Sequence, residues 1–500
     1  MCPIRIIEPT INSEIENSQA KKGQIEKGPT EKIGLHPNDL HSVNLCPDLL
    51  DKYNISGPRY TSYPTALEFN EDYTVDDYSA SLKQLPDGKS LSLYIHIPFC
   101  QHICYYCACN KIITKHRSKS EKYVEYLIKE IELVAKNMPN RQQNPLRQIH
   151  WGGGTPTYLT IEQITQIMQQ VRRCFYVPDE ASTEISIEVD PRAIDIEDVE
   201  KLAELGFNRM SIGVQDFDGK VQKAVNRIQS FELTRDTLLE ARRHGFKSIN
   251  LDLIYGLPFQ TPQTFEATIE KVIDISPDRI SVFNYAHLPH RFKPQRRISG
   301  DDLPSVAEKL AIFQTIIKKL QANGYLYIGM DHFAKPTDEL AIAQQEGKLH
   351  RNFQGYTTHE EYDLIGVGVS SIGSIDGHYH QNLKDVDPYY NAIDRNEIPT
   401  WRGTGIGSDD RVRKAVIFAL ICHFELDISA IESEFNIVFK EYFKTELVAL
   451  KPFIEDELIM VNSEKIEVNN NGRLLIRNIC MVFDAYMNEL HLINSFSKVI

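Results

Sequence analysis

Four of the chain's nine cysteines lie within ten residues, in the stretch CQHICYYCAC that runs from Cys100 to Cys109. The first three follow the spacing C-x-x-x-C-x-x-C, and Cys109 comes two residues after the third. Clustered thiols can form disulfides, bind zinc or hold an iron–sulfur cluster. Disulfides are rare in the cytosol, so a metal site is the favoured interpretation for a cytosolic chain.

The choice between zinc and a cluster depends on further ligands. Structural zinc sites usually combine two short ligand motifs, and the chain has no second C-x-x-C or H-x-x-x-H. His102 lies inside the loop and could ligate zinc, so that alternative stays open. Thiolates at Cys100, Cys104 and Cys107 suit three corners of a cubane cluster, which leaves one iron open to a substrate or cofactor. We therefore predict a catalytic iron–sulfur site with these three ligands.

A glycine run, Gly152-Gly153-Gly154-Thr155-Pro156, follows the second predicted strand. A backbone without side chains can approach a ligand closely, and its carbonyl groups can accept hydrogen bonds from an ammonium group. A glycine run alone is also typical of a plain turn. Together with the thiols it indicates a second part of one binding site.

The elements that must position these residues form a repeating pattern between residues 90 and 335, in which a short β-rich run precedes a loop and a helical stretch. Several runs are apolar on both faces, as expected for strands buried in a parallel sheet. The predicted strands are Leu91–Pro98, Gln148–Gly152, Glu184–Asp190, Arg209–Gln215, Ser248–Tyr255, Arg279–Tyr285 and Tyr325–Asp331.

The stretches between the strands read as helices. Ser120–Met138 has apolar residues at intervals of three and four, and Gly206 and Gly245 each follow a helical run, as helix C-termini require. The fold class is therefore α/β, with a complete or partial parallel (βα) barrel whose active site lies at the carboxyl ends of the strands. That edge gathers the strand-end residues Gly153, Gly154, Glu188, Asp190, Gln215, Asp252, Ala286 and Asp331.

Composition and charge exclude some classes of function. A net charge of −14 disfavours a general nucleic-acid binder, which normally presents a basic face. The longest strongly apolar run, Ala415–Cys422, is too short to span a membrane and reads as a core helix. The N-terminus lacks the apolar segment of a signal peptide, so we expect a cytoplasmic protein.

The predicted domain organisation has four parts. Residues 1–45 are polar without periodicity and are expected to be disordered. An N-terminal element over 46–90 precedes the barrel domain over 91–375, and a mainly helical C-terminal domain covers 376–500. Within the last part, the Gly-rich stretch 400–408 reads as a turn and Lys465–Val468 as a short strand.

The cysteine spacing after an opening strand resembles that of the radical S-adenosylmethionine (SAM) enzymes. In that superfamily the open iron of a [4Fe-4S] cluster is chelated by the methionine moiety of SAM. One electron from the cluster then cleaves SAM to methionine and a 5′-deoxyadenosyl radical, which removes a hydrogen atom from a substrate carbon. The resemblance implies a partial-barrel fold and places the methionine end of SAM at the glycine run.

Further motifs resemble one family within it, the oxygen-independent coproporphyrinogen III oxidases (dehydrogenases) of haem biosynthesis. The resemblance implies oxidative decarboxylation of two propionate side chains of coproporphyrinogen III to vinyl groups, giving protoporphyrinogen IX. It also implies an external electron donor, an unknown electron acceptor, a monomer, and an N-terminal element that caps the substrate. The motifs are YNISGPRYTSYPT (53–65), ISIEVDPR (185–192), IGVQDF (212–217), DLIYGLP (252–258), NYAHLP (284–289), RNFQGYT (351–357) and RNICMVFD (477–484).

The family binds two SAM molecules, and its motifs carry the contacts onto this chain. Cys109 corresponds to a functionally important cysteine that does not ligate the cluster. The position between the last two cluster cysteines is commonly Gly and is Ala108 here, and the aromatic position is Tyr106 where Phe is common. The first SAM would contact Tyr94, Tyr106, Gly153, Glu188 and Ile372, and the second Gly154, Thr155, Gln215, Arg227, Asp252 and Ala286.

A substrate with four carboxylates needs cationic partners. The rival interpretation is a haem-binding chaperone on the same scaffold, but such proteins usually carry Phe in place of Cys109 and lack the YNxSGPRYTSYP element. A radical enzyme for another substrate and a passive electron carrier are further alternatives. The candidate substrate-binding arginines are Arg59, Arg291, Arg296, Arg297 and Arg351.

Overall fold

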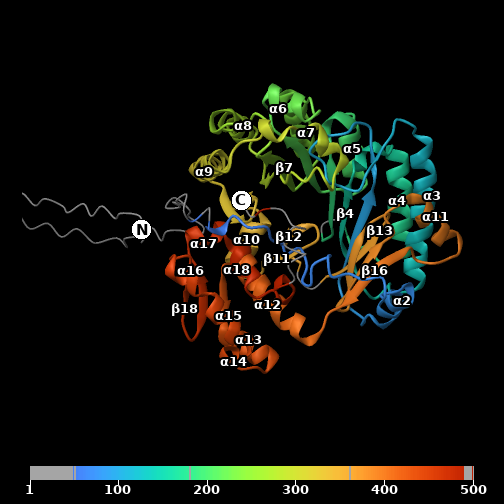
Figure 1. Ribbon diagram of the computed structural model, residues 1–500. Helices are drawn as coiled ribbons and strands as arrows, with labels where there is room; N and C mark the ends of the chain where they lie inside the picture. The colour runs from blue at the N-terminus through green and yellow to red at the C-terminus, as the bar shows by residue number, and fades with distance from the viewer. Residues whose placement is uncertain (1–48, 50–51, 180–181, 360–361, 489–497, 499–500) are drawn as a thin grey trace, which may run out of the picture. The chain divides into compact units, whose positions relative to one another are not determined.

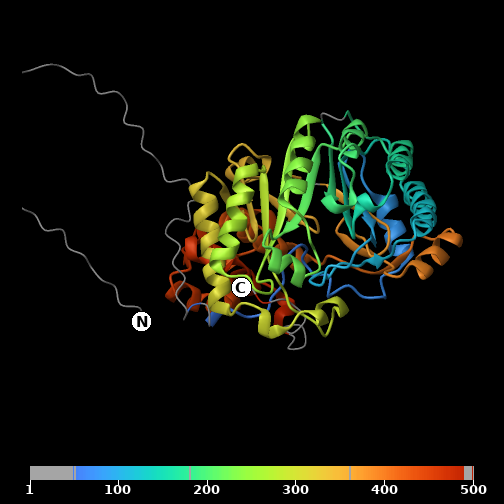
Figure 2. The same ribbon diagram turned by 90° about the horizontal axis from the view of Figure 1, so that it is seen from above.

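A computed structural model describes residues 49, 52–179, 182–359, 362–488 and 498. The extension expected to be disordered, residues 1–45, lies outside the described residues. The described part is built on a curved twelve-stranded sheet with helices along its outer side (Figures 1 and 2). No helix in these described ranges is both long and apolar enough to cross a membrane.

Seven neighbouring strands of the sheet run parallel, in the order β13-β1-β4-β5-β6-β7-β8. Six of them confirm predicted strands, whereas β13 was not predicted. The α/β class with a partial parallel barrel is therefore confirmed. The bounds are β1 (Leu91–Ile97), β4 (Leu146–Gly153), β5 (Glu184–Val189), β6 (Arg209–Gln215), β7 (Ser248–Tyr255), β8 (Arg279–Asn284) and β13 (Asp363–Val367).

The last predicted βα unit differs from the expectation. β9 (Leu326–Gly329) is separated from β8 by β10 (His332–Ala334), which runs antiparallel to both. The chain reverses at Gly329 (φ +148°) and Met330 (φ +52°), and this tight turn inserts the hairpin strand β10 into the sheet. The run Tyr325–Asp331 is thus a strand followed by a turn.

Polar and apolar side chains alternate along the central parallel strands. In β5, Ile185, Ile187 and Val189 are buried, whereas the intervening Glu184, Ser186 and Glu188 are partly exposed. Because successive side chains of a strand point to opposite faces, the apolar set packs under the outer helices and the polar set faces the inside of the curve. The expectation of two apolar faces is therefore wrong for this strand, because its inner face lines a cavity.

The outer helices are amphipathic and end where glycine allows it. Gly206 (φ +94°) follows α5, and Gly245 (φ +84°) follows α7, which confirms both predicted C-termini. Thr160 and Ser305 cap α4 and α9 with their side chains. The helices are α3 (Ser118–Lys136), α4 (Ile161–Cys174), α5 (Asp198–Glu204), α6 (Gly219–Ala224), α7 (Phe231–Arg243), α8 (Pro262–Ile275) and α9 (Val306–Ala322).

The sheet continues beyond β13 through three antiparallel strands, β14 (Ile372–Ile375), β15 (His378–Asn382) and β16 (Thr400–Gly405). The Gly-rich stretch that was expected to be a turn is mostly β16, an edge strand. Gly403 fits there because a Cβ would lie 2.3 Å from the Tyr379 carbonyl oxygen. α2 (Val75–Gln84), α10 (Glu339–Gln345) and α11 (Val386–Asp394) accompany these strands.

The C-terminal elements are mainly helical, as predicted. α12 (Ser408–His423) buries Val416, Ile417, Leu420 and Ile421, so the apolar run near 415–422 is a core helix. The predicted strand at 465–468 is β19 of a small sheet. The other elements here are β17 (Glu425–Asp427), α13 (Ile428–Phe435), α14 (Phe439–Tyr442), α15 (Lys444–Ala449), α16 (Lys451–Glu455), β18 (Ile459–Val461), β19 (Lys465–Val468), α17 (Asn470–Leu474) and α18 (Ile476–Met481).

Candidate active site

A cavity of about 400 Å³ lies inside the curve of the parallel sheet and opens to the cysteine-rich loop. Its walls are the polar faces of β4 to β8, together with the glycine run after β4. Most of the residues expected at the site meet here. The cavity is lined by Cys100, Cys104, Tyr106, Cys107, Cys109, Gly153, Gly154, Thr155, Glu188, Gln215, Arg227 and Asp252.

The cysteine-rich loop connects two short strands, β2 (Phe99–Cys100) and β3 (Ile112–Ile113). The Ile112 N–H donates to the Pro98 carbonyl at 2.7 Å, and the Thr114 N–H donates to the Cys100 carbonyl at 3.0 Å. These two bonds close the loop at its base, so the thiols project from a fixed stem. Cys100 is buried, Cys104 and Cys107 are partly exposed, and Cys109 is exposed.

Polar groups surround the three proposed ligand thiols. Thr155 Oγ1 donates to Cys100 Sγ at 3.4 Å, and Arg192 and Arg227 each donate to Cys104 Sγ at 3.7 Å. A hydrogen bond from the Cys109 thiol and the charge of Lys111 lower the pKa of Cys107 to about 6. The thiolate, the form in which cysteine binds metal, is therefore favoured at Cys107, whereas burial raises the pKa of Cys100 to about 12.

The donor set of this loop fits a cluster that is larger than a single ion. Three thiols face one cavity and have cationic or hydroxyl donors beside them, as an anionic iron–sulfur cluster requires. In the part of the chain that the structure describes, no three His, Cys, Asp or Glu side chains are grouped as ligands of one metal ion.

The glycine run fits closely under the end of β1. The Gly154 N–H donates to the Ile97 carbonyl at 2.8 Å, and a Cβ at Gly154 would lie 2.7 Å from the Pro98 carbonyl oxygen. Gly153 has φ +113°, a conformation that side chains rarely adopt. The glycines are therefore required by the packing of the loop as well as by any ligand.

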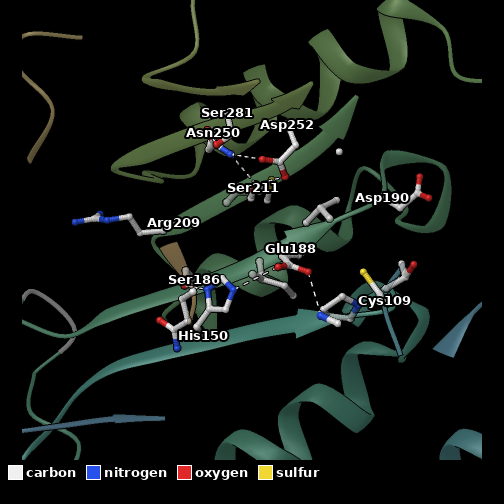
Figure 3. A pocket seen from close by; sticks show the side chains of 18 of the residues that line it. Cys109, His150, Ser186, Glu188, Asp190, Arg209, Ser211, Asn250, Asp252 and Ser281 are labelled. Atoms are coloured by element: carbon white, nitrogen blue, oxygen red, sulfur yellow. Dashed lines mark hydrogen bonds and ion pairs between the residues drawn. The ribbon is translucent and has the colours of Figure 1, made fainter. Parts of the chain in front are cut away.

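Two carboxylates on neighbouring parts of the sheet differ in their surroundings (Figure 3). Burial alone would raise the pKa of Glu188, but His150 Nε2, 3.6 Å from Glu188 Oε1, and the Gly153 N–H lower it below its usual value. Burial raises the pKa of Asp252 to about 6, although Ser211 and Asn250 each donate to it at 2.7 Å. Of these two carboxylates, Glu188 is firmly ionised and Asp252 titrates near pH 6.

Arg227 links the cysteine-rich loop to the sheet. Its guanidinium donates to Asp190 Oδ2 at 3.0 Å and to the Gly213 carbonyl at 2.6 Å, in addition to Cys104 Sγ. Arg192 also binds Asp190, at 2.7 Å. Arg227 was expected to contact the second SAM, and in this structure its guanidinium pairs with Asp190.

Three of the expected SAM contacts do not line the cavity. Tyr94 stacks on the cavity-lining His150, its register partner on β4, with ring centroids 5.9 Å apart. Ala286 follows β8, and Gln295 donates both to its carbonyl (3.1 Å) and to that of Tyr106 (2.9 Å). Ile372 is the first residue of β14.

Sequence analysis missed the polar residues that precede the strand ends by two or more positions. They share the inner face with the strand-end residues, and the period of two was the signal that could have found them. Figure 3 shows several of them pointing into the same space. They are His150, Ser186, Ser211, Asn250 and Ser281.

Comparison with known proteins identifies the family that this chain resembles in sequence and structure. Residues 94–272 match the family model of the Radical SAM superfamily, and residues 407–475 match the HemN C-terminal domain. An oxygen-independent coproporphyrinogen III oxidase of Pseudomonas aeruginosa is 51% identical over 462 residues, which cover 92% of this chain and 100% of that protein. The Escherichia coli protein of the same description is 49% identical over 452 residues (90% and 98%). A solved structure of coproporphyrinogen III oxidase from Escherichia coli, described as a radical SAM enzyme, superposes with a TM-score of 0.83 at 48% identity, covering 87% of this chain and all of that one.

Proposed function

The chain belongs to the oxygen-independent coproporphyrinogen III oxidases of the radical SAM superfamily, and from this premise we propose how its own residues serve the reaction. The activity is oxidative decarboxylation of two propionate side chains of coproporphyrinogen III to vinyl groups, which gives protoporphyrinogen IX. The observation that carries the assignment is the three-thiol loop facing a polar cavity, in a chain about half identical to named members over most of its length.

Cys100, Cys104 and Cys107 would hold the [4Fe-4S] cluster. When bound, the cluster and SAM supply a 5′-deoxyadenosyl radical that takes hydrogen from the substrate. Thr155, Arg192 and Arg227 already donate to two of the thiols and would stabilise the charge of the cluster. The loop is closed at its base, which supports a role in keeping the cluster in one orientation.

Two SAM molecules are proposed, one at each of the two carboxylates. Glu188, ionised by its neighbours, would accept hydrogen bonds from the first, alongside Tyr94, Tyr106, Gly153 and Ile372. Asp252 would accept from the second. The other proposed contacts of that second molecule are Gly154, Thr155, Gln215, Arg227 and Ala286.

Cys109 is proposed as the further catalytic residue. Its thiol is exposed at the cavity beside Cys107, so it can reach a substrate without ligating the cluster. Its presence, with the complete element at 53–65, favours the enzyme over a haem-binding chaperone on the same scaffold. We also propose that the protein acts as a monomer in the cytoplasm, with an external one-electron donor and a separate electron acceptor.

Anaerobic reconstitution tests the function. The protein is loaded with iron and sulfide and supplied with a reductant, SAM and coproporphyrinogen III. The expected products are 5′-deoxyadenosine and protoporphyrinogen IX, and equilibrium binding should give two SAM molecules per chain. Tight haem binding without vinyl formation would instead support the chaperone alternative.

A further inference from the structure

Three sequence motifs outside the parallel strands each bring one arginine to the same place. Arg59 comes from the segment at 53–65, Arg351 from β11 (His350–Asn352), and Arg477 from α18. Arg477 Nε donates to the Pro58 carbonyl at 2.9 Å, and Arg351 Nε donates to the Arg59 carbonyl at 3.2 Å. The backbone around Arg59 is therefore held between the other two, and we call the three the arginine cluster.

The arginine cluster concentrates positive charge in the interior. Arg351 is 5% exposed and Arg477 is 4% exposed. Burial and the two neighbouring guanidinium groups lower the pKa of Arg59 to about 9. Asp331 pairs with Arg59, but within the described ranges no carboxylate lies at ion-pairing distance from Arg351. Because a buried charge without a counter-charge is costly, the site around Arg351 favours an anion.

Unused hydrogen-bonding groups lie beside this charge. Arg351 Nη1, His332 Nδ1 and Asn284 Oδ1 are buried and have no hydrogen-bond partner in the described part of the chain. Burial lowers the pKa of His332 well below its usual value, so it contributes a neutral ring. A small cavity of about 30 Å³, lined by Arg59, Asn284, Asp331 and Arg477 among others, leaves room for a group of a few atoms.

Two arginines of the arginine cluster contact aromatic residues that line the main cavity. Phe283, His332 and Tyr356 line that cavity. The guanidinium carbon of Arg59 lies 5.8 Å from the Phe283 ring centroid, and that of Arg351 lies 4.7 Å from the Tyr356 ring centroid. Arg59 and Arg351 are thus each one side chain away from the main cavity.

We propose that the arginine cluster is a carboxylate-binding subsite of the main cavity, in which Arg59 and Arg351 bind a carboxylate that enters between Phe283 and Tyr356. Arg477 positions Arg59 by holding the backbone at 57–58. Guanidinium groups bind carboxylates through paired, charge-assisted hydrogen bonds, which suits this ligand class. The proposal rests on the proposed function, for which the carboxylate belongs to a propionate of coproporphyrinogen III. The other candidate arginines, Arg291, Arg296 and Arg297, are exposed.

The test compares binding of the tetra-acid and of its tetramethyl ester under anaerobic conditions. Arg59→Gln and Arg351→Gln are expected to raise the Kd for coproporphyrinogen III about ten- to a hundredfold, the range for loss of a charged hydrogen bond. Their Kd for the ester should match that of the parent protein, because the ester has no carboxylate to lose. Arg235→Gln, at an exposed arginine paired with Asp236, is the matched control and should change neither value.

Two further measurements keep the outcomes distinct. Arg351→Lys retains the charge and should give an intermediate Kd, and urea unfolding confirms that each variant is folded. Parent protein that converts no coproporphyrinogen overturns the proposed function. If the parent protein converts coproporphyrinogen, two results would overturn the subsite alone. Either the Gln variants bind the tetra-acid as tightly as the parent, or they lose affinity for the ester to the same extent as for the tetra-acid.

Discussion

The cysteine-rich loop lines the main cavity and the arginine cluster contacts aromatic residues of its lining, but the two are assembled in opposite ways. The loop places all its thiols between Cys100 and Cys109 and is closed by hydrogen bonds at its own base. The arginine cluster takes Arg59, Arg351 and Arg477 from three segments that are each more than a hundred residues apart in sequence and joins them through backbone carbonyls.

The two regions therefore depend on the rest of the fold to different degrees. A local loop needs only its stem, so damage elsewhere in the molecule should leave its chemistry intact. A cluster made from distant segments exists only while those segments are docked, so it reports on the whole fold. Loss of the loop should therefore abolish the reaction in a folded protein, and loss of the cluster should affect stability and substrate binding together.

The largest effect is expected from the loop. Cys104→Ser should prevent stable cluster assembly and lower activity by at least about a thousandfold, because the radical chemistry has no other source. Iron and sulfide content per chain, with the visible absorption of the cluster, measures the loss. Cys174→Ser, at a buried thiol on α4, should retain the cluster, and an equal loss of iron in that variant would contradict the assignment.

The next largest effect is expected from the arginine cluster, where a substitution should lower stability without changing the cysteine-rich loop. Arg477→Gln removes the hydrogen bonds to the carbonyls of Pro58 and Lys498 in a buried place. We expect the free energy of unfolding to fall by about 3 kcal/mol, the usual cost of breaking buried charged hydrogen bonds. Urea unfolding measures this, and iron content should stay at the parent level.

Arg395→Gln is the control for this variant, because Arg395 is exposed and pairs with Glu397, two residues away. It should change the free energy of unfolding by less than about 0.5 kcal/mol. If Arg477→Gln loses iron as Cys104→Ser does, the two regions are not independent and the comparison fails.

The contrast between local and distant contacts also explains which features could be predicted from the sequence. The thiol spacing and the strands β1 and β4 to β8 were predicted because spacing and apolar runs are local signals. The strand β13, the hairpin at β10 and the positions of Arg351 and Arg477 were not, because pairing partners and docked segments depend on distant contacts. Arg59 and Arg351 were proposed only as members of a set of five; Arg351 is buried and Arg59 is partly buried, whereas the other three are exposed.

A third effect concerns Glu130 on α3, which is another assembly of distant segments. The buried carboxylate accepts hydrogen bonds from the Gly368 N–H (2.7 Å), Asn382 (2.6 Å) and Tyr389 (2.6 Å). Burial raises its pKa to about 7 despite these donors. Since the folded pKa exceeds the unfolded one, its stabilising contribution is full below the unfolded pKa and is lost as pH rises through 7.

The parent protein should therefore lose about 2.5 kcal/mol of unfolding free energy between pH 5 and pH 8 through this group. Glu130→Gln removes that part of the pH dependence, and urea unfolding at both pH values measures it. Glu132→Gln, at an exposed residue of the same helix that pairs with Lys136, should leave the dependence unchanged. An identical pH dependence in the parent and in Glu130→Gln would rule out Glu130 as its source.

The smallest effect is expected at Asp252, which lies on β7 of the parallel sheet. Its pKa is raised to about 6 by burial, so it gains its charge between pH 5 and pH 7. As a carboxylate it should bind the cationic second SAM more tightly, and affinity at that site should therefore rise with pH and level off above 7.

Asp252→Asn should weaken binding of the second SAM about tenfold at pH 7.5 and remove the pH dependence of that binding. Equilibrium binding of SAM at pH 5.5 and 7.5 measures both, with the exposed Asp274→Asn on α8 as control. Because Glu188 stays ionised over this range, the first SAM should bind equally at both values, and two equal sites in Asp252→Asn would show that this carboxylate does not hold the second SAM.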